Sequence, residues 1–353
     1  MKILTIIGAR PQFVKAAPVS NALQKAGHEE FLVHTGQHYD PKMSQIFFDE
    51  MGIPAPNINL EVGSGNHGWQ TAQMLMGIEN LLIEEKPDWI LVYGDTNSTL
   101  AGSLAAVKLH IPIAHVEAGL RSFNRRMPEE HNRILTDHAS DLLFCPTQTA
   151  ATHLANEGIT KGVHIVGDVM YDAVLSFTGL AEKNSTLLKD MDIFPNDYFL
   201  ATVHRPANTD NPESLMAIFE AFRELDSTII FPVHPRTRGK IADLIENIEE
   251  FAPKLKLIEP VGYLDMLSLA KNAKTILTDS GGLQKEAYWL ETPCVTLREE
   301  TEWVETVDAG WNTLVGANKK KILFAVNDKN TPKERPSIYG DGRAAEKIAH
   351  TLK

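Results

Sequence analysis

Seven charged side chains fall within the seventeen residues 117–133, in the stretch "EAGLRSFNRRMPEEHNR". Three are carboxylates and four are guanidiniums, and the stretch follows the apolar run "IPIAHV" and leads into a segment with helical periodicity. Carboxylates in such a place can move protons, and arginines can hold an acidic substrate. A solvated surface would carry the same residue types. The stretch therefore predicts either a charged surface or an acid–base site.

Three carboxylates in the first half of the chain stand next to predicted elements. Asp95 follows the apolar run "WILVY" and precedes a helix, where Asp can simply cap the first turn. Glu129 lies after Pro128 at a helix start, where acids complement the helix dipole. Glu117 comes just past a buried strand and before a loop, so neither explanation suits it. Of the three, Glu117 points most directly to a functional site.

The second half places histidine and arginine together at two consecutive strand ends. "TVHRPAN" contains His204 and Arg205, and "PVHPRTRG" contains His234, Arg236 and Arg238. The donors of Arg and His suit phosphate oxygens. Two such clusters in an acidic chain favour a phosphate-binding role.

The segment "TDSGGLQKEA" follows another strand and opens a helix. Ser280, Gly281 and Gly282 would present a hydroxyl and backbone amides to a phosphate at the helix N-terminus. Glu286, about one turn further, could accept hydrogen bonds from ribose hydroxyls. The first strand end, "IIGARPQ", lacks the G-x-G-x-x-G pattern of dinucleotide sites, and we find neither a P-loop nor a metal-ligand cluster. We therefore expect no cofactor and no metal.

Short apolar runs alternate with amphipathic segments along the whole chain, which predicts parallel strands covered by helices on both faces. We expect an α/β protein with two doubly wound, Rossmann-like domains facing a cleft. The predicted domains are 1–170 and 171–341, with a terminal helix over 342–353. Ligands of such folds bind at the carboxyl ends of the strands, where most of the residues above fall.

Bulk composition narrows the function classes. The chain has 353 residues and a net charge of −12, which argues against nucleic-acid or membrane-surface binding. Cys145 and Cys294 stand in apolar runs and are expected to be buried thiols of a reducing compartment. The N-terminus lacks a signal-peptide pattern, and no run approaches the roughly 18 apolar residues of a membrane span. We expect a cytoplasmic protein.

The ordered motifs resemble those of the non-hydrolysing UDP-N-acetylglucosamine 2-epimerases. The resemblance covers nearly the whole chain and comprises "GARPQFVKAAPV", "YGDTNSTLAG", "HVEAGLR", "PEEHNRILTD", "VHR", "VHP", "TDSGGLQKEA" and "TLREETEWVE". It implies the GT-B-like fold shared with nucleotide-sugar glycosyltransferases, a C-terminal helix returning to the first domain, and a homodimer. It also implies inversion at C2 of the sugar, by elimination of UDP to 2-acetamidoglucal and re-addition.

The resemblance implies a role for each residue of the site. The catalytic residues would be Asp95, Glu117, Glu129 and His204, the last as general acid or phosphate partner. Residues holding the UDP-sugar would be Arg10, Lys15, His234, Ser280, Gly281, Gly282 and, on the ribose, Glu286. Which carboxylate takes the C2 proton stays open.

Departures from the best-known branch leave the sugar open. That branch has "GTRPE" where this chain has "GARPQ", so Ala9 and Gln12 differ. It has an acid at the position of Ala207. It also has "TERPE" where this chain has "TEWVE", so Trp303 and Val304 replace an Arg and a Pro. "GARPQF" and "TEWVE" also occur in relatives that epimerise UDP-2,3-diacetamido-2,3-dideoxyglucuronate. A uronate needs an extra cation near C6, which could be Arg121, Arg125 or Arg126.

Other functions stay open as alternatives. A retaining glycosyltransferase, a relative that hydrolyses off free N-acetylmannosamine, and a non-catalytic nucleotide-sugar binder would share much of this pattern. Gln37–His38 resembles part of the site through which substrate activates bacterial members, but Trp69 falls where an Arg is expected. That replacement predicts no such activation.

Overall fold

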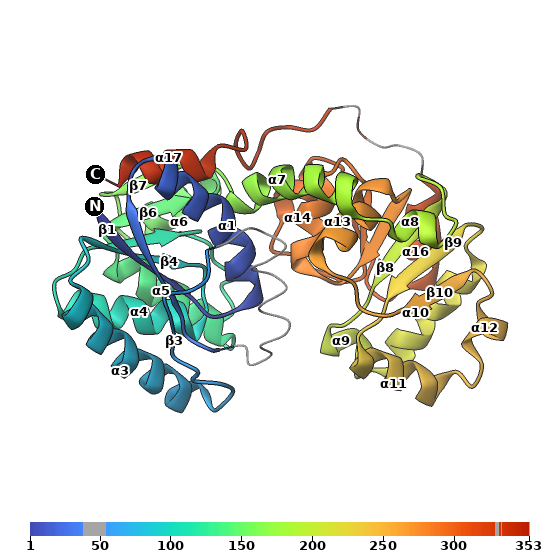
Figure 1. The fold of residues 1–353 in the computed structure, drawn as a ribbon. Helices are drawn as coiled ribbons and strands as arrows, with labels where there is room; N and C mark the ends of the chain where they lie inside the picture. Colours follow the sequence, from blue (N-terminus) through green and yellow to red (C-terminus); the bar gives the residue numbers. More distant parts are fainter. Residues whose placement is uncertain (38–53, 329–331, 333, 353) are drawn as a thin grey trace. The chain divides into compact units, whose positions relative to one another are not determined.

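The computed structural model describes residues 1–37, 54–328, 332 and 334–352, with the side chains of Arg10, Pro235 and Arg236 left undescribed. The chain divides into two units, Met1–Ser176 with Ser337–Lys353, and Phe177–Pro336. Each unit is a parallel sheet flanked by helices (Figure 1). This confirms the predicted α/β class with two Rossmann-like domains.

The first unit is built on a seven-stranded sheet in the order β3-β2-β1-β4-β5-β6-β7. Every neighbouring pair is parallel, and β1 pairs with both β2 and β4, so the strand order reverses between β1 and β4. Loops on either side of such a reversal form the usual ligand site. The strands are β1 (Lys2–Ile7), β2 (Glu29–His34), β3 (Ile58–Asn59), β4 (Trp89–Tyr93), β5 (Ile113–Val116), β6 (Leu142–Cys145) and β7 (Val163–Ile165).

Helices cover both faces of this sheet, which explains why its strands are continuous apolar runs. Ile90, Leu91 and Val92 of β4 are all fully buried. Gly102 lets helix α4 approach closely, because a Cβ atom there would lie 2.5 Å from Ile6 Cδ1. The helices are α1 (Arg10–Lys25), α3 (His67–Glu85), α4 (Asn97–Lys108), α5 (Pro128–Ala139), α6 (Gln148–Asn156), α7 (Val169–Asn184) and α17 (Ala344–Thr351).

The second unit repeats the scheme with a six-stranded parallel sheet in the order β10-β9-β8-β11-β12-β13. Its reversal lies between β8 and β11. The strands are β8 (Tyr198–Thr202), β9 (Thr228–Pro232), β10 (Leu255–Ile258), β11 (Thr275–Thr278), β12 (Cys294–Thr296) and β13 (Asn312–Leu314). The helices are α8 (Leu187–Asp190), α9 (Pro206–Thr209), α10 (Pro212–Glu224), α11 (Pro235–Leu244), α12 (Ile248–Phe251), α13 (Tyr263–Asn272), α14 (Gly281–Trp289), α15 (Val304–Asp308) and α16 (Lys319–Asn327).

The C-terminal helix α17 packs against α1 in the first unit (Figure 1). His28 Nε2 lies 3.0 Å from the Ala349 carbonyl oxygen, and the Ala345 amide donates to Asp172 Oδ2 over 2.7 Å. Asp172 is 6% exposed, and its burial raises the pKa of its carboxyl to about 6. The start of α17 is therefore capped by a buried acid.

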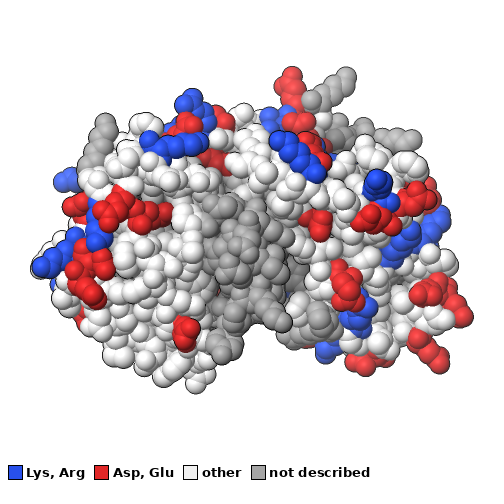
Figure 2. Space-filling model, viewed as in Figure 1, with Lys and Arg blue, Asp and Glu red and all other residues white. Residues whose placement is uncertain are grey.

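Charges are mixed on the surface, and the two thiols lie inside. Figure 2 shows acidic and basic side chains interspersed over the described part of the face in view. Cys145 and Cys294 are buried and unpaired, as predicted, and burial raises the pKa of each thiol to about 12. Among the described residues, no helix combines the length and apolarity that crossing a membrane requires.

Candidate active site

Glu117 and Lys15 meet beside Gly94 at the carboxyl edge of the first sheet. Strands β4 and β5 pair so that Tyr93 lies opposite Val116, which sets Gly94 next to Glu117. Lys15 comes from α1 and forms an ion pair with the Glu117 carboxylate. The side chains of Lys15 and Glu117 are 11% and 10% exposed, so the pair is largely shielded from solvent. The sequence prediction that Glu117 is not a solvated charge is confirmed.

Glu117 has a left-handed backbone, with φ of +72°. Non-glycine residues rarely adopt this conformation, which costs about 1–3 kcal/mol and persists only where the surroundings enforce it. The amides of Glu117 and Ala118 both donate to the Phe144 carbonyl oxygen over 3.1 Å. Strain of this kind concentrates at functional sites.

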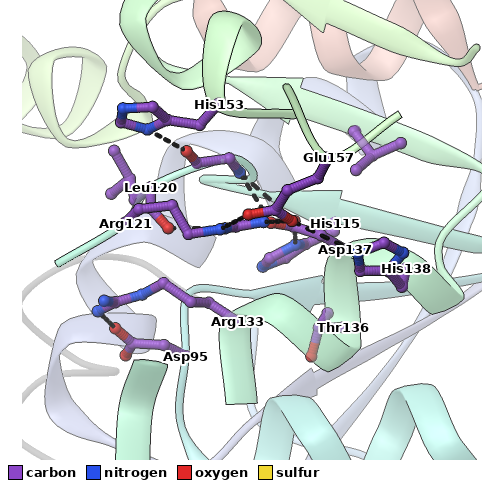
Figure 3. Close-up of polar contacts among 12 residues, drawn as sticks. Asp95, His115, Leu120, Arg121, Arg133, Thr136, Asp137, His138, His153 and Glu157 are labelled. Atoms are coloured by element: carbon purple, nitrogen blue, oxygen red, sulfur yellow. Dashed lines mark hydrogen bonds and ion pairs between the residues drawn. The ribbon is translucent and has the colours of Figure 1, made fainter. Parts of the chain in front are cut away.

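Asp95 pairs with Arg133 of α5, as Figure 3 shows. The side-chain Nδ2 of Asn132 donates to the Asp95 carbonyl oxygen over 2.9 Å. Burial disfavours the charge on Arg133, but its two carboxylate partners raise the pKa of the guanidinium. The N-cap of α4 is Thr96, whose Oγ1 accepts from the Thr99 amide. Capping therefore does not explain Asp95, whose side chain stays 34% exposed.

Glu129 and Glu130 differ sharply, although both lie in the first turn of α5. Glu130 is 1% exposed and accepts from the Ser122 amide (2.9 Å), the Ser122 hydroxyl (2.8 Å) and the Phe123 amide (2.9 Å). These bonds outweigh burial and lower the pKa of its carboxyl, so Glu130 anchors the loop before α5. Glu129 is half-buried and has no hydrogen bond or ion pair among the described residues. Of the two, only Glu129 has a carboxylate left for a ligand.

Gln12 joins the two loops at the strand reversal, a role that sequence reasoning missed. Its Oε1 accepts from the amides of Gly8 (2.8 Å) and Ala9 (3.0 Å). Its Nε2 donates to the Tyr93 carbonyl (2.9 Å) and to Thr96 Oγ1 (3.0 Å). A glutamate could accept the first pair of bonds but could not donate the second. The neighbouring Arg10 begins α1, and its side chain lies outside the described part of the structure.

The suggestion that Arg121 reads a sugar carboxylate is wrong. Its side chain is 1% exposed and donates to Asp137 over 2.7 Å and to both oxygens of Glu157, each over 2.7 Å (Figure 3). With every face of the guanidinium engaged, it cannot take a ligand. Arg125 and Arg126 are exposed.

His204 and His234 follow the ends of β8 and β9 in the second unit. Asp279 is fully buried and accepts from the amides of His204 and Arg205, both over 3.0 Å. His204 Nδ1 lies 3.4 Å from Asp279 Oδ1. Burial lowers the pKa of His204, and the neighbouring charges of Arg205 and His234 act in the same direction while Asp279 opposes them. Asp279 thus sets the shape of the His204 loop, and nothing in the sequence singled it out.

The N-terminus of α14 gathers hydrogen-bond donors of the kind that bind anions. Ser280 is the N-cap, with Oγ accepting from the Leu283 amide over 3.4 Å. A Cβ atom on Gly281 would lie 3.5 Å from Trp303 Nε1 and 3.7 Å from Arg205 Nη2. An indole N–H and a guanidinium thus border the N-terminal amides of this helix. Glu302 Oε2, which Arg298 binds over 3.0 Å, lies at the same 3.7 Å from that Cβ position. A Cβ atom on Gly282 would lie 4.0 Å from Ser280 Oγ, which is ordinary van der Waals contact.

Two neighbouring residues of α14 complete this group. Glu286 is 7% exposed and accepts from the Tyr263 hydroxyl over 3.0 Å. Lys285 is 3% exposed, and its Nζ lies 3.9 Å from the centroid of the Trp303 ring and 5.4 Å from that of Trp289. A cation over a Trp face is attracted by the ring quadrupole. Lys285 therefore fixes the orientation of Trp303, which the sequence marked only as a departure.

The residues compared with an activating site are only partly described. The Ser98 hydroxyl donates to Gln37 Oε1 over 2.7 Å, and Trp69 on α3 is 51% exposed. His38 lies outside the described residues. Within the described part of the chain, no group of three or more His, Cys, Asp or Glu side chains could hold a metal ion.

Comparison with known proteins gives a consistent result. The family model described as "UDP-N-acetylglucosamine 2-epimerase" matches residues 21–353. A UDP-N-acetylglucosamine 2-epimerase homolog of Methanococcus maripaludis is 57% identical over 100% of this chain and 99% of its own. The UDP-2,3-diacetamido-2,3-dideoxy-D-glucuronate 2-epimerase of Pseudomonas aeruginosa is 50% identical, with the same coverage. The crystal structure of Methanocaldococcus jannaschii UDP-GlcNAc 2-epimerase with UDP-GlcNAc and UDP is 47% identical, covers 100% of this chain and 99% of its own, and has a TM-score of 0.88.

Proposed function

The chain belongs to the UDP-N-acetylglucosamine 2-epimerase family, and from this premise we propose that it interconverts UDP-N-acetylglucosamine and UDP-N-acetylmannosamine. It is a UDP-sugar 2-epimerase, an isomerase. The observation that carries the choice of reaction is the strained, shielded Glu117, paired with Lys15 beside Gly94, the residue before Asp95. A C2–H bond is a poor acid, and positioned carboxylates are what its cleavage requires.

In the proposed reaction, a carboxylate takes the proton from C2 while the C1–O bond to UDP breaks. The electron pair of the C2–H bond becomes the C1=C2 double bond of 2-acetamidoglucal. UDP then adds back at C1, and C2 receives a proton on the opposite face. The sequence of steps is redox-neutral. Asp95, Glu117 and Glu129 would exchange the protons.

The second unit would hold the UDP. The Gly281 and Gly282 amides, Arg205 and the Trp303 indole supply donors to the pyrophosphate, whose departing charge such donors stabilise. His204 would act as general acid or phosphate partner, and Glu286 would accept from the ribose. Arg10, Lys15 and His234 would complete the set of binding groups.

Epimerisation of UDP-2,3-diacetamido-2,3-dideoxyglucuronate by the same mechanism is the second candidate. The observation that favours it is the loop held by Glu130, in which Arg125 and Arg126 remain exposed. With Arg121 engaged elsewhere, these two are the cations of this stretch left to meet a C6 carboxylate.

Proton NMR in D2O tests both candidates. Incubation with UDP-N-acetylglucosamine should give UDP-N-acetylmannosamine, with deuterium at C2 of both sugars. Product only from the diacetamido-uronate would select the second candidate. Free N-acetylmannosamine would indicate a hydrolysing enzyme. If Glu117→Gln lost C2 exchange but still transferred the glycosyl group, the protein would be a glycosyltransferase. If the native protein bound the UDP-sugar without turning it over, it would be a non-catalytic binding protein.

We further propose that the protein is a cytoplasmic homodimer associating through α3. Trp69, Met76 and Ile83 lie seven residues apart on this helix and are 51%, 52% and 56% exposed. An apolar stripe of this kind suits burial against a second copy. Light scattering should give twice the 39.2 kDa of one chain for the native protein and one chain mass for Met76→Glu. A monomeric native protein would refute the dimer.

A further inference from the structure

Helix α5 is connected to all three carboxylates of the proposed reaction. Glu129 lies on it, Arg133 pairs with Asp95, and Asp137 reaches the turn that contains Glu117. These residues are spaced four apart, so they share one face of the helix. Figure 3 shows Arg133 directed at Asp95 and Asp137 directed at His115 and Arg121. One rigid element can therefore set the mutual placement of the three acids.

Asp137 binds the chain on both sides of Glu117. It is 1% exposed and accepts from His115 Nδ1 over 2.7 Å, from the Gly119 amide over 3.1 Å and from Arg121 over 2.7 Å. His115 is two residues before Glu117, and Gly119 is two residues after it. Burial disfavours the charged carboxylate, but His115 and Arg121 lower the pKa of Asp137, so it is held as an anion. Asp137 thus holds the chain on both sides of the left-handed residue, while the Phe144 carbonyl oxygen holds the amides of Glu117 and Ala118.

The same carboxylate also acts on the loop before Asp95, through His115. The second ring nitrogen of His115, Nε2, lies 2.8 Å from the carbonyl oxygen of Gly94. The ring of the fully buried His115 thus spans from the Asp137 carboxylate to the Gly94 carbonyl oxygen. His115 therefore ties the Gly94–Asp95 peptide to Asp137.

We propose that Asp137 is a positioning residue, which acts through His115 and Gly119 to hold Glu117 and Asp95 in the geometry for proton transfer at C2. The inference rests on the proposed function, in which Glu117 and Asp95 exchange protons with the sugar. The role of Asp137 does not include contact with substrate, since its side chain is fully enclosed.

The test compares Asp137→Asn with Glu157→Gln. The first substitution keeps the side-chain volume but replaces the carboxylate by a neutral amide. The amide has one acceptor oxygen, so it cannot accept all the bonds that Asp137 accepts from His115, Gly119 and Arg121. Glu157 binds the opposite side of Arg121 but neither His115 nor Gly119, so its variant is the matched control for loss of one carboxylate from the network. A small misplacement of catalytic groups costs on the order of 100-fold in rate. Asp137→Asn should therefore lose about 100-fold in kcat with KM changed by less than about threefold, whereas Glu157→Gln keeps kcat within about twofold.

Hydrogen–deuterium exchange of backbone amides tests whether Asp137 holds the Glu117 turn, and it does not require catalytic turnover. The amides of residues 117–120 should exchange faster in Asp137→Asn and at the native rate in Glu157→Gln. If native protein shows no C2 exchange with either UDP-sugar, the proposed function fails, while this measurement still decides whether Asp137 holds the turn. Unchanged exchange in Asp137→Asn would overturn the inference.

A folded Asp137→Asn variant with native kcat would also overturn the positioning role. The same holds if kcat falls in both variants in proportion to the fall in Tm. If Asp137→Asn does not fold, His115→Gln replaces it. Gln can bond one of the two oxygens but cannot span both, so kcat should fall with KM retained. Native kcat in His115→Gln would refute the positioning role.

Discussion

Gly94 lies directly against the carboxylate of Glu117: a Cβ atom on Gly94 would be 3.2 Å from Glu117 Oε2 and 3.6 Å from Lys15 Nζ. The absence of a side chain at this position gives the buried ion pair its space. Gly94 also has φ of +64°, which side chains rarely tolerate. Two independent constraints therefore fix a glycine here.

Gly94→Ala should lower both stability and activity. The left-handed backbone costs an alanine about 1–2 kcal/mol. The methyl group would also press on the Glu117 carboxylate, which must shift by a few tenths of an ångström. Urea denaturation should show this loss in the free energy of unfolding. Steady-state kinetics should show a larger relative change in kcat than in KM. Gly158→Ala is the control, because φ there is +84° but nothing lies within 4 Å of the added methyl. Equal losses of kcat in both variants would contradict the steric explanation.

Gln12→Glu should destabilise the first unit by about 2–3 kcal/mol, since a buried carboxylate would face the Tyr93 carbonyl and lose two donated bonds. The exposed Gln24 lies on the same helix, and Gln24→Glu should leave the free energy of unfolding unchanged. Chemical denaturation of both variants measures the difference. Native stability in Gln12→Glu would mean that the donated bonds contribute little.

Asp172→Asn should stabilise the protein at neutral pH and not at acidic pH. The folded-state pKa of about 6 lies above the ordinary value of 3.8. Folding thus favours the protonated carboxyl. The stability that the protonated carboxyl contributes is fully present below pH 3.8 and is lost as the pH rises through about 6. This shift corresponds to about 3 kcal/mol. The variant should gain up to that amount at about pH 8 and little at about pH 4.

Thermal unfolding of native and variant proteins at both pH values checks this pH window. Asp197→Asn, at an exposed position, serves as control and should show no such difference between the acidic and the alkaline condition. A gain in Asp172→Asn that is equal at the two pH values would assign the effect to packing of the amide.

If the UDP pyrophosphate binds at Gly281 as proposed, Trp303→Phe should weaken UDP binding about tenfold, because it removes the N–H that would donate to the phosphate and keeps a ring over Lys285. Calorimetric titration with UDP measures the change. Trp289→Phe alters the other ring beside Lys285, away from Gly281, and should bind UDP as the native protein does. Equal weakening in both would trace the effect to Lys285.

The strand-and-helix alternation predicted both sheets, because buried parallel strands are continuous apolar runs and this pattern is local. Glu117 was also predictable, since neither capping nor solvation explains an acid directly after a buried strand. The different roles of Glu129 and Glu130 were not. They are neighbours of identical type, and only the rotation of α5 about its axis decides which one turns inward to Ser122.

Arg121 shows a second limit of the sequence. Its partners Asp137 and Glu157 are 16 and 36 residues away, so no local pattern reveals that the guanidinium is already bound. The same holds for Gln12, whose partners lie 81 and 84 residues along the chain. Residue type and strand-end position indicate where a site lies. Side-chain direction, which decides what each residue does there, depends on contacts between distant segments.

The return of α17 to α1 bears on the order in which the molecule is made. The second unit is one continuous segment, 177–336, but the first unit is formed from both ends of the chain. During translation, α1 leaves the ribosome early and lacks its α17 partner until residues 344–351 emerge. The second unit can therefore reach its final form while the first is still missing a helix. Of the two units, the one that carries the carboxylates is completed second.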